Sequence, residues 1–179
     1  IARAGVGVDN IDLDAATSKG IVVMNSAEAS TTSTAEYAFA LLMALARRIG
    51  HAFLTLNNGG WDRSTFVGTQ LAGKTIGVVG LGNTGRRTVS ICKGGLNMQA
   101  IAYDPYLEAS DFEERGAKSV SLEELMTESD FISVHCPLNA ETTDLIGTKE
   151  LALMKPGAFI VSCARGGIIN EQDLEKALD

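Results

Sequence analysis

Positively charged residues, histidines and cysteines are all scarce in this sequence, and each shortage narrows the possible functions. Fifteen lysines and arginines stand against 22 aspartates and glutamates, so the net charge is −7. A basic surface for contact with the backbone of DNA or RNA is therefore not expected, and nucleic acid is excluded as a partner. The three cysteines form no CxxC pair, and their odd number argues against a disulfide framework. A reducing, cytoplasmic setting fits this pattern.

Long apolar runs are also missing. No window approaches the roughly 20 apolar residues that span a bilayer, and the first residues lack the pattern of a signal peptide, so no membrane partner is expected. The chain opens on Ile1 with a strand end and closes at Asp179 within a helical pattern. We interpret it as a piece of a longer protein, large enough for one good core and a small second lobe.

A regular alternation of apolar runs and helical segments begins after residue 73. The strand-like runs are 75–80, 99–104, 131–136 and 158–164, and the helical segments between and after them are 82–95, 121–126, 148–154 and 171–178. Ser121 and Asn170 stand where helix caps are expected. Strands that are apolar on both faces and alternate with helices predict an α/β fold with a doubly wound parallel sheet, covered on both sides.

The first 73 residues have a different organisation. Asp12 or Asp14 is expected to cap a short helix that ends at Gly20, before an apolar strand at 21–25. From Thr34 the apolar residues recur at helical spacing, which predicts a long amphipathic helix. The stretch 57–73 is rich in turn formers and contains the predicted boundary between two lobes.

A glycine-rich loop follows the first regular strand. VVGLGNTG places Gly80, Gly82 and Gly85 between a strand and a helix, and Asp104 ends the next strand. The spacing alone is weak and could mark a structural turn, but this strand–loop–helix context is that of a dinucleotide fingerprint. Gly80 permits a tight turn, Gly82 lets the backbone approach a diphosphate, and Gly85 lets helix and strand pack closely. The carboxylate of Asp104 would accept hydrogen bonds from the ribose hydroxyl groups and would therefore favour NAD over NADP.

Several motifs, taken together, resemble the D-isomer-specific 2-hydroxyacid dehydrogenases. They are RAGVGVDNIDLDAATSKGIVVMN, TSTAEYAFALLMALARR, GGWDRSTFVGTQLAGKTIGVVGLGNTG, YDP, SVHCPLNAETTDLIG and CARGGIINEQDL. The resemblance is collinear over nearly the whole chain. It implies a remnant of a flavodoxin-like substrate domain at 1–30, a long helix and connection at 31–73, and a truncated Rossmann NAD-binding domain at 74–179. It also implies a homodimer or homotetramer.

The activity that this resemblance implies is hydride transfer between NAD and a small D-2-hydroxy acid. The first expected substrate is D-3-phosphoglycerate, oxidised to 3-phosphohydroxypyruvate in serine biosynthesis. One alternative is a glyoxylate or hydroxypyruvate reductase of the same family. A second is a non-catalytic, NAD-sensing protein of the corepressor type. A third is a structural piece that has lost cofactor binding.

Arg165 is the candidate catalytic residue. The resemblance implies that it binds the substrate carboxylate and polarises the reacting carbonyl, which suits a planar guanidinium that stays charged. The alternative is an arginine paired with a core carboxylate. The resemblance further implies that the backbone N–H groups of Val6 and Gly7 hold the carboxylate. Arg3 and Arg63 are then candidates for a substrate phosphate, or else solvated surface residues.

Further cofactor contacts follow from the same resemblance. Asn83 and Thr84 occupy the diphosphate loop but depart from the usual family residues, which weakens the expected contact there. The residues expected to line the nicotinamide and ribose side are Cys136, Pro137, Cys163, Ala164 and Arg165. The thiols among them are expected to act as small buried hydrophobes rather than nucleophiles.

A proton donor is missing from these candidates. The only histidines are His51 and His135, and both are interpreted as structural. The family's catalytic histidine and its carboxylate partner would follow residue 179, so this stretch is expected to bind NAD but to turn over poorly alone. No metal site is expected.

Overall fold

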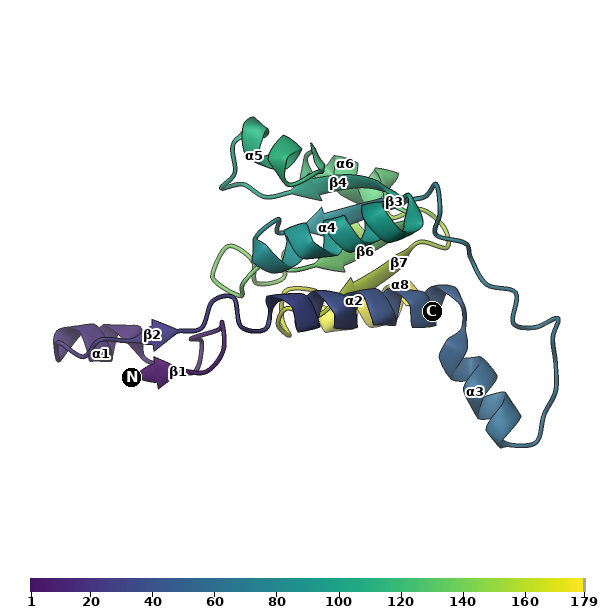
Figure 1. The fold of residues 1–179 in the computed structure, drawn as a ribbon, viewed down its shortest axis with the longest axis horizontal. Helices are drawn as coiled ribbons and strands as arrows, with labels where there is room; N and C mark the ends of the chain where they lie inside the picture. Colours follow the sequence, from purple (N-terminus) through teal and green to yellow (C-terminus); the bar gives the residue numbers. More distant parts are fainter. Residues whose placement is uncertain (179) are drawn as a thin grey trace.

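Five parallel strands form the main sheet of the structure, a computed structural model that describes residues 1–178 (Figure 1). The strand order is β5-β4-β3-β6-β7, and every pair is parallel. The strands are β3 Thr75–Val79, β4 Gln99–Tyr103, β5 Lys118–Ser119, β6 Phe131–Val134 and β7 Phe159–Ser162. The predicted α/β class with a parallel sheet is confirmed.

Helices cover both faces of this sheet. They are α4 Asn83–Leu96, α5 Ala109–Glu114, α6 Leu122–Glu128, α7 Thr148–Ala152 and α8 Glu171–Leu178. One apolar cluster includes Val89 of α4, and the other includes Leu125 of α6. All four residues of β6 are buried, and each large apolar side chain so buried stabilises the fold by about 1.5–3 kcal/mol. The apolar strand pattern therefore reflects a sheet packed on two sides.

The direction of winding reverses beside β3. From β3 the chain passes through α4 to β4 on one side, while β6 and β7 continue the sheet on the other. In such sheets the carboxyl ends of the strands on either side of the reversal leave a crevice, where ligands bind. The loop after β3 and the loop after β6 therefore meet at one edge of the sheet.

The predicted long helix is α2, Thr31–Ala46, which lies beside α4 and β7 (Figure 1). Its buried face consists of Ala35, Ala38, Leu42 and Ala46. A second helix, α3 (Ile49–Asn57), was not predicted. It begins after Arg48, whose φ of 54° breaks the helical path, and it buries none of its residues.

The segment 58–74 contains neither helix nor strand, as expected from its turn formers. In Figure 1, α3 and this segment project away from the body of the molecule. Within residues 1–178 no single helix has the length and apolar content of a membrane span; α2 and α3 meet those criteria only as a pair bent by 65°.

A small unit at the N-terminus projects on the opposite side (Figure 1). It contains β1 Ala2–Arg3, α1 Leu13–Ser18 and β2 Met24–Asn25, with β1 and β2 parallel. Asp12 caps α1 by accepting a hydrogen bond of 2.8 Å from the Ala15 N–H, as predicted. The strand expected over 21–25 is reduced to β2, because β1 offers only two residues for pairing. The division at residues 30 and 73 stays a prediction.

Candidate functional site

The glycine loop turns sharply between β3 and α4. Gly80 has a φ of +88°, and a Cβ there would lie 2.7 Å from the backbone nitrogen of Cys136. A Cβ on Gly85 would lie 2.1 Å from the carbonyl oxygen of Gly80. A larger residue at either position would push α4 or the loop after β6 away. The predicted reasons for these two glycines, a tight turn and close helix–strand packing, are therefore visible in the structure.

The amino end of α4 is open to an anion. Gly82 is the N-cap of the helix, makes no side-chain cap, and is followed by a first turn without acidic residues. A Cβ on Gly82 would meet nothing within 4 Å. The N–H groups of the first turn and the positive end of the helix dipole therefore face free space, which is the arrangement that binds a diphosphate. The residues present fit the diphosphate of a dinucleotide.

Asp104 follows β4 and lies beside the same loop. Its Oδ2 accepts a hydrogen bond of 3.0 Å from the Leu81 N–H, and its Oδ1 accepts one of 3.1 Å from the Tyr106 N–H. The carboxylate is partly exposed, and each of its oxygens has further acceptor capacity. Its place beside the glycine loop is the one that a ribose-binding carboxylate requires, although Asp104 does not line the cavity described next.

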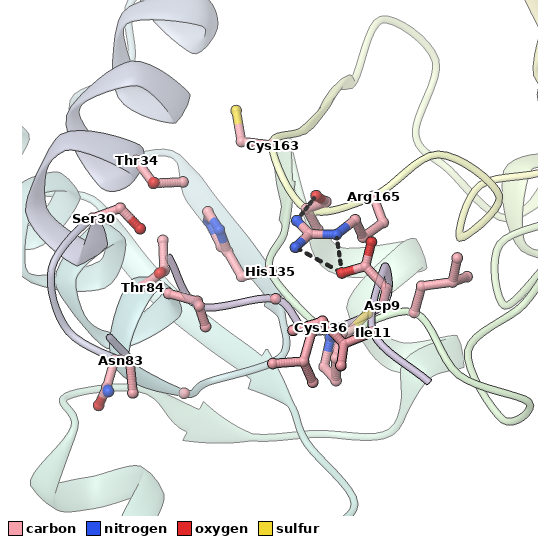
Figure 2. Close-up of a pocket in the computed structure, with 18 of the residues that line it drawn as sticks. Asp9, Ile11, Ser30, Thr34, Asn83, Thr84, His135, Cys136, Cys163 and Arg165 are labelled. Carbon is pink, nitrogen blue, oxygen red and sulfur yellow. Dashed lines mark hydrogen bonds and ion pairs between the residues drawn. The ribbon is translucent and has the colours of Figure 1, made fainter. Parts of the chain in front are cut away.

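A cavity of about 800 Å³ lies where the carboxyl ends of β3, β6 and β7 face the loop after β1 (Figure 2). It is lined by ten of the predicted residues: Val6, Gly7, Gly82, Asn83, Thr84, Cys136, Pro137, Cys163, Ala164 and Arg165. Residues that are far apart in sequence converge here because parallel strands end at the same edge. The volume is in the range typical of small-molecule sites.

Arg165 lies three residues after β7 and contacts Asp9 in the lining of this cavity (Figure 2). Its Nε and Nη2 both donate to Asp9 Oδ1 at 3.2 Å, and its Nη1 donates to the carbonyl oxygen of Ala164 at 2.8 Å. A backbone hydrogen bond and the Arg165 guanidinium hold the pKa of Asp9 below its usual value. The partner is an exposed carboxylate from the N-terminal unit rather than a core carboxylate, so the structural alternative for Arg165 does not describe this pair.

The backbone around Gly7 comes very close to this guanidinium. A Cβ on Gly7 would lie 1.8 Å from Arg165 Nη2. Asn25 Nδ2 donates a hydrogen bond of 2.9 Å to the carbonyl oxygen of Val6. This bond fixes the backbone of the loop next to the arginine. Val6, Gly7 and Arg165 therefore form one wall of the cavity, as a shared role in carboxylate binding requires.

The two candidates for a substrate phosphate lie outside the cavity lining. Arg3 is exposed, and its Nε donates to the carbonyl oxygen of Gly7 at 3.3 Å. Arg63 is exposed in the segment between α3 and β3, which projects from the body of the molecule (Figure 1). Arg3 therefore contacts the outer side of the wall that holds Arg165 through Gly7, whereas Arg63 is not among the residues near it.

His135 follows β6 and is largely buried beside α4. Its Nε2 lies 3.1 Å from Thr88 Oγ1 and 2.8 Å from Ser133 Oγ. Burial lowers the pKa of this imidazole to about 4, so the ring is neutral near pH 7. These contacts support the structural interpretation of His135. The other histidine, His51, is exposed on α3.

The cysteines at the cavity are poor nucleophiles. Burial raises the pKa of both Cys136 and Cys163, which keeps the thiols protonated near neutral pH. This agrees with their expected role as small apolar residues. Among residues 1–178, no group of three or more histidine, cysteine or carboxylate side chains is placed to hold a metal ion.

Eleven lining residues were not among the predicted site residues, and they include Asp9, Ser30, Thr34 and His135. Asp9 adjoins the predicted Gly7, so the VGVDN motif contained a local signal for it. Ser30 and Thr34 belong to the amino end of α2, where only the tertiary structure brings the helix to the cavity (Figure 2).

Comparison with known proteins identifies the protein family of this chain. Residues 39–179 match the family described as D-isomer specific 2-hydroxyacid dehydrogenase, NAD binding domain. The chain is 48% identical over 179 residues to a D-3-phosphoglycerate dehydrogenase of Methanocaldococcus jannaschii, covering 99% of this chain and 34% of that protein. It is 46% identical to a D-3-phosphoglycerate dehydrogenase of Synechocystis sp., covering 100% of this chain and 32% of that protein. The chain thus spans about a third of the length of these curated relatives.

Solved structures show the same fold. A D-lactate dehydrogenase from Aquifex aeolicus, complexed with NAD and lactic acid, has a TM-score of 0.90 at 32% identity, over 99% of this chain and 53% of that chain. A glyoxylate reductase from Paecilomyes thermophila has a TM-score of 0.90 at 38% identity, over 97% of this chain and 52% of that chain.

Proposed function

Because the chain belongs to the D-isomer-specific 2-hydroxyacid dehydrogenase family, we propose that it forms the cofactor-binding part of an NAD-dependent oxidoreductase. The whole protein would act on the CH–OH group of D-3-phosphoglycerate and form 3-phosphohydroxypyruvate, a step of serine biosynthesis. Two relatives that bear this enzyme's name are 48% and 46% identical to the chain. The solved lactate and glyoxylate enzymes are 32% and 38% identical.

One observation carries this proposal: Arg165 and the open amino end of α4 face the same cavity. A diphosphate-binding loop and a carboxylate-binding guanidinium are the two anchors that a dehydrogenase of a 2-hydroxy acid needs. The glycine loop fits the cofactor, and the loop at Val6 and Gly7 supplies backbone groups beside the arginine.

The chain's own residues would bind and orient the reactants. NAD, when bound, supplies the acceptor for the hydride. The first turn of α4 would hold its diphosphate, and Asp104 would accept hydrogen bonds from the adenosine ribose and disfavour a 2′-phosphate. Cys136, Pro137, Cys163 and Ala164 would exclude water from the reacting end of the cavity.

Arg165 would bind the substrate carboxylate as a planar fork and polarise the adjacent carbonyl group. For this, its guanidinium must leave Asp9 Oδ1, which now accepts from both Nε and Nη2. The N–H groups of Val6 and Gly7 would complete the carboxylate site. Arg3 and Arg63 remain candidates for binding the substrate phosphate. For this, the rest of the protein or a second copy of the chain would have to bring them to the substrate.

We further propose a cytoplasmic homodimer or homotetramer. The support is the apolar surface of α3, where Ile49, Phe53, Leu54 and Leu56 are all more than half exposed. Contiguous apolar surface of this kind marks an interaction site.

The proposed activity can be tested with the full-length protein. NADH formation is followed by absorbance with D-3-phosphoglycerate, and then with D-lactate at the same concentration. We expect kcat/KM to be at least 100-fold higher for D-3-phosphoglycerate. Faster reduction of glyoxylate or hydroxypyruvate would instead assign the protein to the reductases. Saturable NADH binding without turnover of any 2-hydroxy acid would favour a corepressor-like sensor.

A further inference from the structure

A second hollow lies beside the glycine loop. It has a volume of about 480 Å³ and is lined by polar and charged residues of α2, α4 and α5 and by Arg115, which follows α5. The residues that matter here are Thr31, Asn83, Arg86, Arg87, Ser90 and Arg115. Asn83 also lines the large cavity, so the two hollows adjoin at the first residue of α4.

Three arginines line this hollow, and Glu114 is its only acidic lining residue. In the part of the chain that the structure describes, the ion pairs are made by Lys74, Lys118, Lys155, Arg165 and Lys176, so none of these three arginines is neutralised by a carboxylate. This cluster is unusual in a chain with a net charge of −7. Like charges that share a site repel one another, and a bound anion relieves that repulsion.

Further donors surround the arginines. The first turn of α2 has no acidic residue, and its N-cap Ser30 makes no side-chain cap, so the positive end of the α2 dipole is not neutralised locally. The Thr31 hydroxyl oxygen is shielded from solvent and has no hydrogen-bond partner among the described residues. Arg115 is held in place because its Nη1 donates to the carbonyl oxygen of Leu81 at 2.8 Å.

We infer that this hollow binds a phosphate group as its dianion, next to the cofactor loop. Guanidinium forks that come from two different helical segments, together with hydroxyl and amide donors, suit a tetrahedral group with several charged oxygens better than a planar carboxylate. The phosphate is inorganic phosphate or a small phosphomonoester, because Asp104 beside the same loop disfavours the 2′-phosphate of a dinucleotide. The inference rests on the hollow itself and does not depend on the proposed dehydrogenase activity.

The test uses the full-length protein and inorganic phosphate. Phosphate is titrated by isothermal calorimetry at an ionic strength held constant with potassium chloride. We expect saturable binding to one site per chain, at least 10-fold weaker in the double variant Arg86→Ala/Arg87→Ala. A matched double variant, Lys19→Ala/Lys149→Ala, removes two exposed cations elsewhere and should bind phosphate as the unmodified protein does. Circular dichroism checks that both variants are folded.

Titrations with NAD+ and NADP+ then test whether the hollow is separate from the cofactor site. The inference of a separate phosphate site is overturned if the arginine variant binds NADP+ at least 10-fold more weakly and NAD+ with less than a 2-fold change, while phosphate competes with NADP+ only. If the hollow takes a separate phosphate, phosphate binds equally well to protein saturated with NADP+. The inference is also overturned if phosphate shows no saturable binding, or if the folded arginine variant binds it as tightly as the unmodified protein.

Discussion

Two nitrogens of Arg165 donate to a single oxygen of Asp9, although the residues are 156 positions apart in the sequence. This ion pair joins the N-terminal unit to the end of β7 in the lining of the cavity (Figure 2). A substrate carboxylate would compete with Asp9 for the same fork. The pair therefore makes Arg165 both a ligand-binding group and a link between two parts of the chain.

Replacing Arg165 with lysine should impair the proposed reaction more than binding of the cofactor alone. Lysine keeps the charge but loses the planar, bidentate geometry. We expect kcat/KM for D-3-phosphoglycerate to fall about 100-fold, equivalent to about 2.7 kcal/mol of transition-state stabilisation. Steady-state kinetics of the full-length protein measure this, with Arg47→Lys at the end of α2 as the control. A change of less than 3-fold would remove Arg165 from its proposed role.

Asp9→Asn should make the substrate bind more tightly. Without a charged competitor, the Arg165 fork is available to a carboxylate, so we expect KM to fall about 2- to 5-fold, in line with the small free energy of an exposed ion pair. The measurement is KM for the hydroxy acid near pH 7, with Glu175→Gln as the control, because Glu175 is exposed on α8 and does not line the cavity. A higher KM in Asp9→Asn would show that the carboxylate helps to position the arginine instead.

The Asp9 pair also has a defined pH dependence. The folded-state pKa of Asp9 is lowered, so its contribution to stability is present above the ordinary carboxyl value of 3.8 and is lost as the pH falls through the folded value. Near pH 7 the pair is fully charged. Protonation of Asp9 should therefore weaken the ion pair with Arg165 only below about pH 4.

Gly85→Ala should destabilise the fold and weaken NADH binding together. A methyl group would lie 2.1 Å from the Gly80 carbonyl oxygen, and displacement of α4 by such overpacking costs about 1–3 kcal/mol. Gly94→Ala is the matched control in the same helix, because its Cβ meets nothing within 4 Å; it should stabilise by about 0.5–1 kcal/mol. Urea unfolding and NADH fluorescence measure both effects. Equal stability of the two variants would contradict the packing argument.

His135 should make the protein sensitive to mild acid. Burial lowers its folded-state pKa to about 4 from its ordinary value of 6.5, so between these values the unfolded chain binds a proton that the folded chain does not. Its contribution is fully present above pH 6.5 and is lost as the pH falls towards 4, by up to about 3 kcal/mol. We expect His135→Gln to flatten this part of the stability curve in urea unfolding. An unchanged slope between pH 6.5 and 4.5 would show that folding does not lower the pKa of His135.

The sequence was sufficient to predict the features that depend on neighbouring residues. Four of the five strands of the main sheet, the glycine loop and the Asp12, Ser121 and Asn170 caps each follow from patterns within a few positions, and the structure confirms them. The comparisons confirm the family that the motifs indicate. The site roles of the individual residues stay predictions.

Features that depend on tertiary contacts were missed. The two-residue strand β5 exists because β4 offers it a partner. The helix α3 begins after a left-handed Arg48, with no side-chain cap to signal it. Asp9 is brought to Arg165 only by the fold, and the three arginines of the second hollow come from two helical segments that are not adjacent in sequence. Patterns within a few residues contain no information on contacts between segments that are distant in the sequence.

The helix α3 has a consequence for how the protein can be handled. Nine residues are too few to hold a helix in water by backbone hydrogen bonds alone, and this one has no buried side chain. In the proposed oligomer, the surface of a second copy would cover this helix and supply its order. Backbone amides in α3 should therefore exchange with deuterium within seconds in any preparation where that cover is absent, and slowly where it is present, which gives a gauge of intact assembly before catalysis is assayed.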